Sequence, residues 1–380
     1  MFELPLAVPI ALLLLALFAA GVTALRIRSL PDLPLEPSEA PASVCLCIPA
    51  RNEAAELGPA LDSWLAQDLP GLHIVVVDDG STDATPQILA ERTPRHPGRL
   101  TVIRNDALPA GWLGKNHALH LATATPQARS ADGLLFVDAD VRADDPALVR
   151  RALAMLEADP AEVLALVPAV DTAGFWERLI LPFGATAFLW MVPPSRVASP
   201  KSRIACGIGA FTLIRREAYD ALGGHAAAPL EPVDDMMLAR RAKAAGFRNR
   251  VACGGPGLHL RMYPGLGAFV RGLRKNAVGW PGTVGMALPG AALLVTLFAS
   301  PLILALGGHP GWGLGLWLLV PAFVGSAHQR LSRRPMDLAW ALWPLIGLPL
   351  AAGLLWALAD RLRGVNHWRG RSVRLRPRRG

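Results

Sequence analysis

The chain has 380 residues, of which 52% are hydrophobic and only 18% are charged, and its mean hydropathy is +0.34. This composition is too apolar for an ordinary soluble protein of this length. The formal net charge is +8, and arginines cluster in residues 361–380 directly after an apolar segment, which favours a membrane surface over nucleic acid as the partner.

Cysteine spacing makes a zinc site unlikely. The four cysteines are Cys45, Cys47, Cys206 and Cys253, and none forms a C-x-x-C pair. A reduced, cytoplasm-facing domain is the simplest account of this pattern.

The N-terminal segment reads as a membrane helix. Residues 4–25 are almost wholly apolar and long enough to cross a bilayer. A signal peptide is the alternative, but no basic residue precedes the apolar run. Arg26 and Arg28 follow it, so the positive-inside rule places the next domain in the cytoplasm. We therefore expect a transmembrane helix in residues 1–28 and a proline-rich linker in residues 29–42.

Residues 43–280 carry the pattern of an α/β domain. β-Branched and apolar runs alternate with helical segments, which predicts a mostly parallel sheet with helices on both faces. In such sheets ligands bind beyond the carboxyl ends of the strands. The predicted strands are residues 44–49, 73–77, 100–104, 134–137, 161–167 and 208–214. One predicted helix ends near residue 67, and two others span residues 116–124 and 232–245.

Acidic residues stand at two of these strand ends. Asp78 and Asp79 follow the second strand, and Asp138 and Asp140 follow the run at residues 134–137. Side chains alternate along a strand, so Asp138 and Asp140 are expected on one face. Two neighbouring carboxylates repel unless a cation lies between them, and Mg²⁺ or Mn²⁺ commonly bridges such carboxylates to a diphosphate. A solvated acidic turn is the alternative.

The apolar content rises again in residues 281–360, which we interpret as membrane segments followed by a basic tail at residues 361–380. Three single crossings would leave that tail outside, against the positive-inside rule. Pro344 and Pro349 interrupt the last segment, so we expect it to dip into the membrane and return. Residues 175–191 are read as an amphipathic, membrane-grazing stretch. The candidate spans are residues 285–306, 311–327 and 338–359.

Four motifs now resemble, in order and spacing, the family-two glycosyltransferases of the GT-A fold. They are residues 49–53 (PARNE), 78–83 (DDGSTD), 138–140 (DAD) and 234–241 (DDMMLARR). Two further stretches, residues 108–118 and residues 261–276, look like the membrane-anchored branch that glycosylates carotenoids, of which hopanoid-associated glycosyltransferases are relatives. The Q-x-x-R-W run of the processive synthases is missing from the region of residues 271–274, which favours a single-transfer enzyme.

The resemblance implies a donor site for a nucleotide diphosphate sugar, with a UDP-sugar expected. Asp140 would hold a divalent metal, Mg²⁺ or Mn²⁺, and Asp138 would meet the donor ribose or the metal. Asp79 would accept from the N–H of a uracil, and Lys115 would lie near the phosphates. A solvated lysine at a helix start and a helix-terminal acid are the alternatives for Lys115 and Glu53. The remaining residues implied for this pocket are Asn52 and Glu53.

The same resemblance assigns the acceptor side. An inverting transfer needs a general base opposite the leaving group, and the second acid of the family's pair maps to Asp235. Asp234 stands where the family has Glu, which leaves its role open. Arg261 and Tyr263 are expected in an acceptor-side loop, and no histidine is assigned a catalytic role.

Together these inferences predict an inverting, metal-dependent, non-processive transferase of the inner membrane. Its acceptor would be a membrane lipid such as a carotenoid or hopanoid, and nucleic acid is not expected as a partner. Two alternatives stay open. One is a polyprenol or glycan-assembly glycosyltransferase, and the other is a catalytically inactive nucleotide-sugar-binding membrane scaffold.

Overall fold

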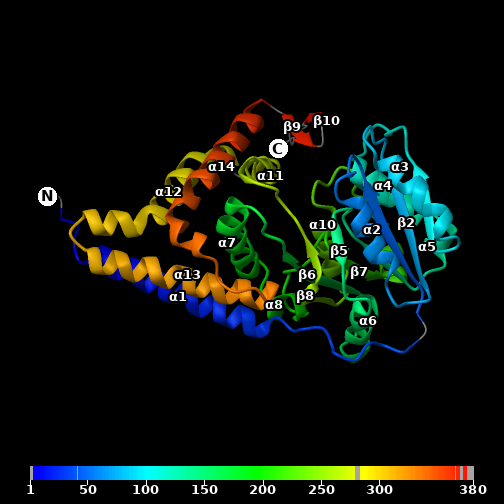
Figure 1. The fold of residues 1–380 in the computed structure, drawn as a ribbon, viewed down its shortest axis with the longest axis horizontal. Helices are drawn as coiled ribbons and strands as arrows, with labels where there is room; N and C mark the ends of the chain where they lie inside the picture. The colour runs from blue at the N-terminus through cyan, green and yellow to red at the C-terminus, as the bar shows by residue number, and fades with distance from the viewer. Residues whose placement is uncertain (1–2, 41, 279–282, 364, 369–370, 375–380) are drawn as a thin grey trace.

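A computed structural model describes residues 3–40, 42–278, 283–363, 365–368 and 371–374 (Figure 1). An α/β domain forms one end of the molecule, and long apolar helices extend from it to the other end. The N-terminal helix α1 (Ala7–Ser29) lies among these apolar helices, and the linker after it leads along the domain to the first strand.

The central sheet has strands in the order β3-β2-β1-β4-β7-β6-β8-β5. Strand β1 is parallel to β2 and β4, and β2 is parallel to β3, which is the predicted parallel arrangement. Strand β7 is antiparallel to β4 and β6, and β5 is antiparallel to β8, so the sheet as a whole is mixed. The strands are β1 (Val44–Ala50), β2 (Leu72–Asp78), β3 (Leu100–Arg104), β4 (Gly133–Phe136), β5 (Val141–Ala143), β6 (Val163–Val170), β7 (Thr212–Arg215) and β8 (Asn249–Leu260).

Helices cover both faces of this sheet, as the continuous apolar strands require. Leu46 and Ile48 of β1 face one core, while Cys45 and Cys47 face the other. The first core is closed by α2 (Leu57–Leu65), α3 (Thr85–Arg92) and α6 (Leu148–Ala158). The second is closed by α4 (Gly114–Thr123), α9 (Arg216–Ala221) and α10 (Asp234–Ala244). All four cysteines are buried and free.

Two expected strands end or begin elsewhere. Strand β4 stops at Phe136, so Asp138 and Asp140 lie in the turn after the strand rather than within it. The run predicted at residues 208–214 becomes strand β7 only from Thr212, because Phe211 N–H donates to the Ile208 carbonyl across a turn (2.9 Å). The helix predicted at residues 232–245 is present as α10, which begins at Asp234.

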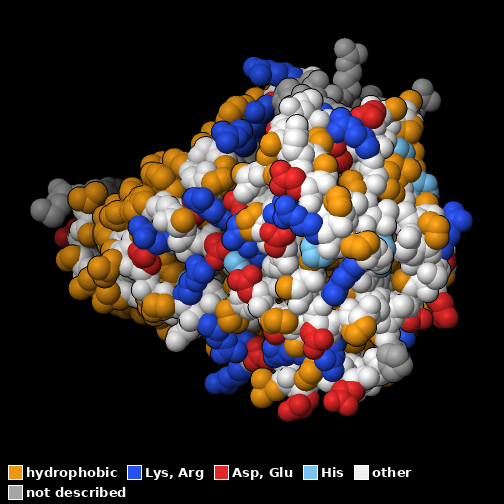
Figure 2. All heavy atoms as spheres, turned by 45° about the vertical axis from the view of Figure 1, so that its right-hand side comes forward, with side chains coloured by type: hydrophobic (Ala, Val, Ile, Leu, Met, Phe, Trp, Pro, Cys, Tyr) orange, Lys and Arg blue, Asp and Glu red, His pale blue; other side chains and the backbone are white. Residues whose placement is uncertain are grey.

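Among the residues that the structure describes, four helical segments are long and apolar enough to cross a membrane, judged by length and composition. They are α1, most of α12 (Thr283–Leu306), α13 (Pro310–Ser332), and the segment Leu338–Leu362, which joins the 3₁₀ helix η3 (Leu338–Ile346) to α14 (Gly347–Leu362). Their outer faces expose large apolar side chains such as Phe18 and Leu318. Figure 2 shows these apolar side chains gathered on the part of the molecule beyond the α/β domain.

The last apolar segment enters between the other helices and returns to the same end. Its first part packs beside the domain end of α13, where the Trp340 and His328 rings meet at 5.3 Å. Its midpoint, Gly347, lies against Phe298 of α12. Its end returns to α11 (Leu266–Val278), where Asp360 accepts from Arg274 (2.8 Å). This path has the form of the predicted dip, whose relation to a bilayer stays a prediction.

Helix α7 (Phe175–Met191) joins the α/β domain to the apolar helices. Leu179 and Ile180 pack with Trp343 of η3, and Trp190 donates from Nε1 to Thr23 of α1 (2.9 Å). The stretch predicted to graze the membrane is thus a helix that packs on the apolar bundle with one face and leaves Phe175, Trp190 and Met191 exposed, and its contact with a membrane stays a prediction. The remaining short elements are α5 (Pro126–Arg129), α8 (Pro194–Ala198), η1 (Thr93–Arg95), η2 (His225–Ala227) and the hairpin β9 (Val365–Trp368) and β10 (Arg371–Arg374).

Candidate active site

An open pocket of about 140 Å³ lies at the carboxyl ends of β1, β2 and β4. This is the edge at which the alternating α/β pattern places a ligand. Five of the residues predicted for the donor or metal line it, whereas Asn52 does not. The lining consists of Pro49, Ala50, Arg51, Glu53, Asp79, Lys115, Ala118, Asp138, Ala139 and Asp140.

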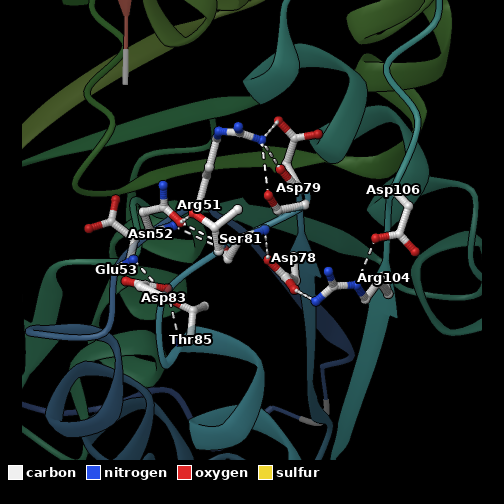
Figure 3. A network of polar contacts seen from close by, with 12 residues as sticks. Arg51, Asn52, Glu53, Asp78, Asp79, Ser81, Asp83, Thr85, Arg104 and Asp106 are labelled. Carbon is white, nitrogen blue, oxygen red and sulfur yellow. Dashed lines mark hydrogen bonds and ion pairs between the residues drawn. The ribbon is translucent and has the colours of Figure 1, made fainter. Parts of the chain in front are cut away.

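Hydrogen bonds join the loop after β1 to the loop after β2 (Figure 3). Asn52 has φ +53°, a left-handed conformation that Asn tolerates better than most residues. Its N–H donates to Ser81 Oγ (2.9 Å), and its Oδ1 accepts from Thr82 N–H (2.8 Å). The Glu53 N–H donates to Thr85 Oγ1 (2.9 Å). Asn52 therefore holds the rim of the pocket in place.

The paired acids after β2 have different surroundings. Asp78 accepts from Ser81 N–H (3.0 Å) and pairs with Arg104 (2.8 Å), which gives it a structural role. Asp79 is also buried but lines the pocket, and it accepts from Asn105 Nδ2 (2.7 Å). Asp79 is thus the acid of this pair that faces a ligand.

Arg51 and Asn105 are site residues that the sequence reasoning missed. The Arg51 guanidinium lines the pocket, lies 3.8 Å from the Asp79 carboxylate, and donates to the Asp79 and Gly80 carbonyls. Arg51 lies inside the PARNE motif, and this position could have indicated its role. Asn105 follows β3 without a recognisable motif, and only the fold brings it to Asp79.

Lys115 joins the pocket to the acidic start of α10. Its Nζ lies 2.8 Å from Asp138 Oδ1 and 2.9 Å from Asp234 Oδ1. Burial alone lowers the pKa of Lys115, but the charges of Asp138, Asp234 and Asp235 outweigh burial and raise the pKa well above its ordinary value. Lys115 is therefore a charged, paired lysine, and its alternative interpretation as a solvated helix-start residue is wrong.

The two acids at the start of α10 differ in pKa. Burial would raise the pKa of Asp234, but the Lys115 charge holds it well below its usual range. Burial and the neighbouring Asp234 charge raise the pKa of Asp235 to about 7, against the opposing effect of Lys115. Where the surroundings of two adjacent titratable groups separate their pKa values, the group with the higher pKa is the one that takes up the proton. Asp235 can therefore take up a proton near neutral pH.

We expect the Asp235→Asn protein to unfold at a higher temperature than the wild type at alkaline pH. Because the pKa of Asp235 is higher in the folded than in the unfolded chain, the free energy of unfolding falls as pH rises through that interval. Asn has no proton to lose and escapes this fall. Thermal unfolding in detergent should show a gain of a few degrees at about pH 8 that shrinks toward about pH 4. A gain that does not change with pH would contradict this origin.

Arg261 and Tyr263 are not among the residues that line the pocket, and the Tyr263 ring lies against Phe269 of α11. Leu260, just before Arg261, pairs with Val141, just after Asp140, so this loop begins next to the acidic turn. Arg261 pairs with the buried Glu177 of α7 (2.8 Å), which also accepts from Gly265 N–H (3.0 Å). The loop expected on the acceptor side is therefore fixed to α7.

The histidines predicted to lack a catalytic role each have a local partner. His117 lies 3.2 Å from Asn105 Nδ2, His120 stacks on Trp112, and His259 lies between Asp171 and Asp144. None of the three lines the pocket.

No group of three or more His, Cys, Asp or Glu side chains in the described part of the chain is arranged to hold a metal. Asp138 and Asp140 nevertheless line the same pocket. Mg²⁺ is usually bound through one or two carboxylates together with substrate phosphates, so a complete protein cage is not required. The two carboxylates fit a divalent ion that arrives with a diphosphate.

Comparison with known proteins identifies this domain. The family model "Glycosyl transferase family 2" matches residues 45–223. Residues 45–223 are a family 2 glycosyltransferase domain. Asp79, Lys115, Asp138 and Asp140 fall inside this match, whereas Asp234 and Asp235 lie beyond its end.

Relatives and a solved structure extend the similarity beyond that domain. The chain is 27% identical over 222 residues to the 4,4'-diaponeurosporenoate glycosyltransferase of Staphylococcus aureus strain USA300, covering 58% of this chain and 56% of the relative. With the protein of strain bovine RF122 it is 27% identical over 261 residues, 68% of this chain and 66% of the relative. The chain thus spans little more than half the length of the first of these relatives.

The fold matches a mannosyltransferase from Pyrobaculum calidifontis, solved in complex with GDP-Man and Mn²⁺. The TM-score is 0.55 at 22% identity, and the match covers 94% of this chain and 98% of the other. This likeness confirms the predicted fold class, an α/β domain accompanied by apolar helices.

Proposed function

We propose that this chain transfers a sugar from a nucleotide diphosphate sugar to an acceptor held in a membrane, with Asp235 as the general base. The observation that carries the proposal is the Lys115 bridge, which joins a carboxylate of the family 2 pocket to the acids at the start of α10. A donor pocket and a proton-accepting carboxylate are thereby held in one rigid arrangement.

On the donor side, Asp79 would accept from an N–H of the base, and the Lys115 ammonium would favour the phosphates. Asp140, together with Asp138, would hold the divalent cation, which when bound stabilises the negative charge that develops on the leaving diphosphate. The structure solved with GDP-Man and Mn²⁺ supports a nucleotide diphosphate sugar and a divalent cation as the molecules bound here.

On the acceptor side, Asp235 would take the proton from an acceptor hydroxyl while the hydroxyl oxygen attacks the anomeric carbon of the sugar. The bond from that carbon to the diphosphate breaks at the same time, and attack opposite the leaving group inverts the configuration. A pKa raised toward neutrality suits a base that must be ionised before the reaction and protonated after it.

The apolar helices support an acceptor dissolved in the bilayer. Relatives named for a carotenoid acid, 4,4'-diaponeurosporenoate, make a carotenoid the first candidate, and a hopanoid is the second. A single transfer per acceptor fits the missing Q-x-x-R-W run. We further propose a multi-pass inner-membrane protein with the domain on the cytoplasmic side, which agrees with Arg26 and Arg28 at the domain end of α1.

The test is a transfer assay with the purified full chain in detergent, using a panel of UDP-sugars and GDP-mannose. Each donor is supplied with and without Mn²⁺ or Mg²⁺, and with carotenoid, hopanoid or polyprenol fractions. We expect metal-dependent release of the nucleoside diphosphate that rises at least about tenfold when the right lipid is added. A chain that binds a donor but transfers to no fraction would favour the scaffold alternative, and a chain that binds no donor would overturn the site.

A further inference from the structure

Asn116, at the start of α4, contacts the loop that leads into α10. Its side chain is 1% exposed, and its Nδ2 lies 3.1 Å from the Ala228 carbonyl, 3.2 Å from the Pro229 carbonyl and 3.0 Å from the Glu231 carbonyl. An amide nitrogen carries two hydrogens, so three carbonyls share them. A single buried side chain thus gathers the backbone of residues 228–231.

This loop ends directly at the proposed base. Only two residues separate Glu231 from Asp234, where α10 begins. The N–H of Leu113, just before α4, donates to the Pro229 carbonyl (2.9 Å), which adds a second bond between the two segments. Lys115, next to Asn116, pairs with Asp234 itself. The first turn of α4 therefore holds the start of α10 through both backbone and side chain.

The backbone at the start of α10 has a second close neighbour, Gly207. A Cβ atom at Gly207 would lie 2.0 Å from the Asp235 carbonyl oxygen, so the chain at residue 207 presses directly against the backbone of the base. The segment that carries Asp235 thus contacts both Gly207 and the first turn of α4. If the α4 contacts were lost, the base would be free to move away from Gly207.

We propose that Asn116 is a positioning residue for the transfer reaction, because its buried amide gathers the carbonyls of residues 228–231 and thereby fixes Asp235 relative to the donor pocket. Asn116 is not among the residues that line that pocket. The kinetic part of this inference rests on the proposed function. Displacement of a reacting group by about 1 Å can reduce a rate about a hundredfold, so the contact matters for turnover.

Gln67 offers a matched control. Its amide is likewise buried and gathers loop carbonyls, since Nε2 donates to Ala143 (3.1 Å) and Asp145 (2.8 Å). It belongs to the other face of the sheet and does not touch α10. Asn116→Ala and Gln67→Ala each remove a buried side-chain amide that donates to backbone carbonyls of another segment. Each should lower the Tm by a similar amount.

The first measurement is hydrogen–deuterium exchange of the full chain in detergent. We expect the amides of residues 228–237 to exchange at least about tenfold faster in Asn116→Ala than in the wild type, and to be unchanged in Gln67→Ala. This readout does not depend on turnover. Unchanged exchange in that segment of Asn116→Ala would overturn the proposal.

The second measurement is steady-state transfer by the same proteins. We expect kcat to fall about thirtyfold or more in Asn116→Ala, with the Kd for the donor within about twofold of the wild type, and Gln67→Ala to keep kcat within about threefold. Equal losses of kcat in both variants would overturn the positioning role. A wild type that transfers no sugar would overturn the proposed function instead, and the exchange comparison would then decide whether Asn116 fixes this segment.

Discussion

Asp235→Asn is expected to remove transfer while leaving donor binding intact. A general base contributes about 10²–10⁴-fold to a rate, and Asn cannot accept the acceptor proton. Asp235 is not among the pocket-lining residues, whereas the carboxylates that face a donor, Asp79, Asp138 and Asp140, are unchanged in the variant. We therefore expect kcat to fall by about 10²–10⁴-fold with the donor Kd within about twofold of the wild type.

The measurement combines donor titration by calorimetry with the lipid transfer assay. Glu217→Gln is a suitable control, because Glu217 is also an acid in the first turn of a helix, α9, but is exposed and outside the pocket. That variant should keep wild-type kcat. An Asp235→Asn protein that retained more than about a tenth of the wild-type kcat would show that another group accepts the proton.

The pH profile gives a second check on the same residue. Since the pKa of Asp235 is raised by burial and by the Asp234 charge, transfer should lose activity as pH falls through neutrality and the base becomes protonated. The pH at which activity falls should depend on Asp235. Its neighbour Asp234 should stay ionised throughout, because its pKa lies well below its usual range.

Sequence pattern was sufficient for the parts of the fold that local chemistry controls. Strands β1, β2 and β4 are continuous apolar runs ending in polar residues, and their parallel pairing places Asp79 and Asp138 at one edge. The path of the last apolar segment also follows local signals, since two prolines and basic flanks oppose a straight crossing. These features depend on residues close together in the chain.

The rest depends on contacts between distant residues. Residues 208–211 have the composition of a strand, but Gly209 must leave room for Asp138, because a Cβ there would lie 2.4 Å from the Asp138 carboxylate. The chain therefore turns before β7 begins. Asn105 reaches Asp79, and Asn116 reaches the loop before α10, only because helices and strands remote in sequence pack together. Asn105 lies in none of the motifs, and the stretch of residues 108–118, which contains Asn116, does not indicate this contact.

The partners of Lys115 show the same limit most clearly. The sequence predicts a lysine near phosphates, whereas the structure adds a bridge to Asp234, whose place in the chain is remote from α4. Asp234 stands where the resemblance implies Glu, and Lys115 Nζ reaches its carboxylate directly (2.9 Å). Asp234 thus has a definite role as the partner of Lys115, which the sequence left open.

Lys115→Met is accordingly expected to destabilise the protein and to impair transfer. The substitution leaves Asp234 buried without its cation, and loss of one partner of a buried ion pair costs about 3–5 kcal/mol. Asp138 is more exposed, so its own loss is partly compensated by solvent. We expect a Tm well below that of the wild type at neutral pH, with transfer reduced because the acids on both sides of the bridge repel each other.

The loss of Tm in Lys115→Met should depend on pH. The Lys115 charge holds the pKa of Asp234 below its value in the unfolded chain, so the stability it provides is present above the unfolded pKa and is lost as pH falls. The difference in Tm between Lys115→Met and the wild type should therefore persist from about pH 8 down to about pH 4, the pKa of Asp in the unfolded chain, and shrink as the pH falls further. The double variant Lys115→Met, Asp234→Asn removes the unpaired carboxylate and should recover part of the lost Tm. A deficit that is constant with pH, or a double variant no more stable than the single one, would show that Lys115 acts through packing and not through its charge.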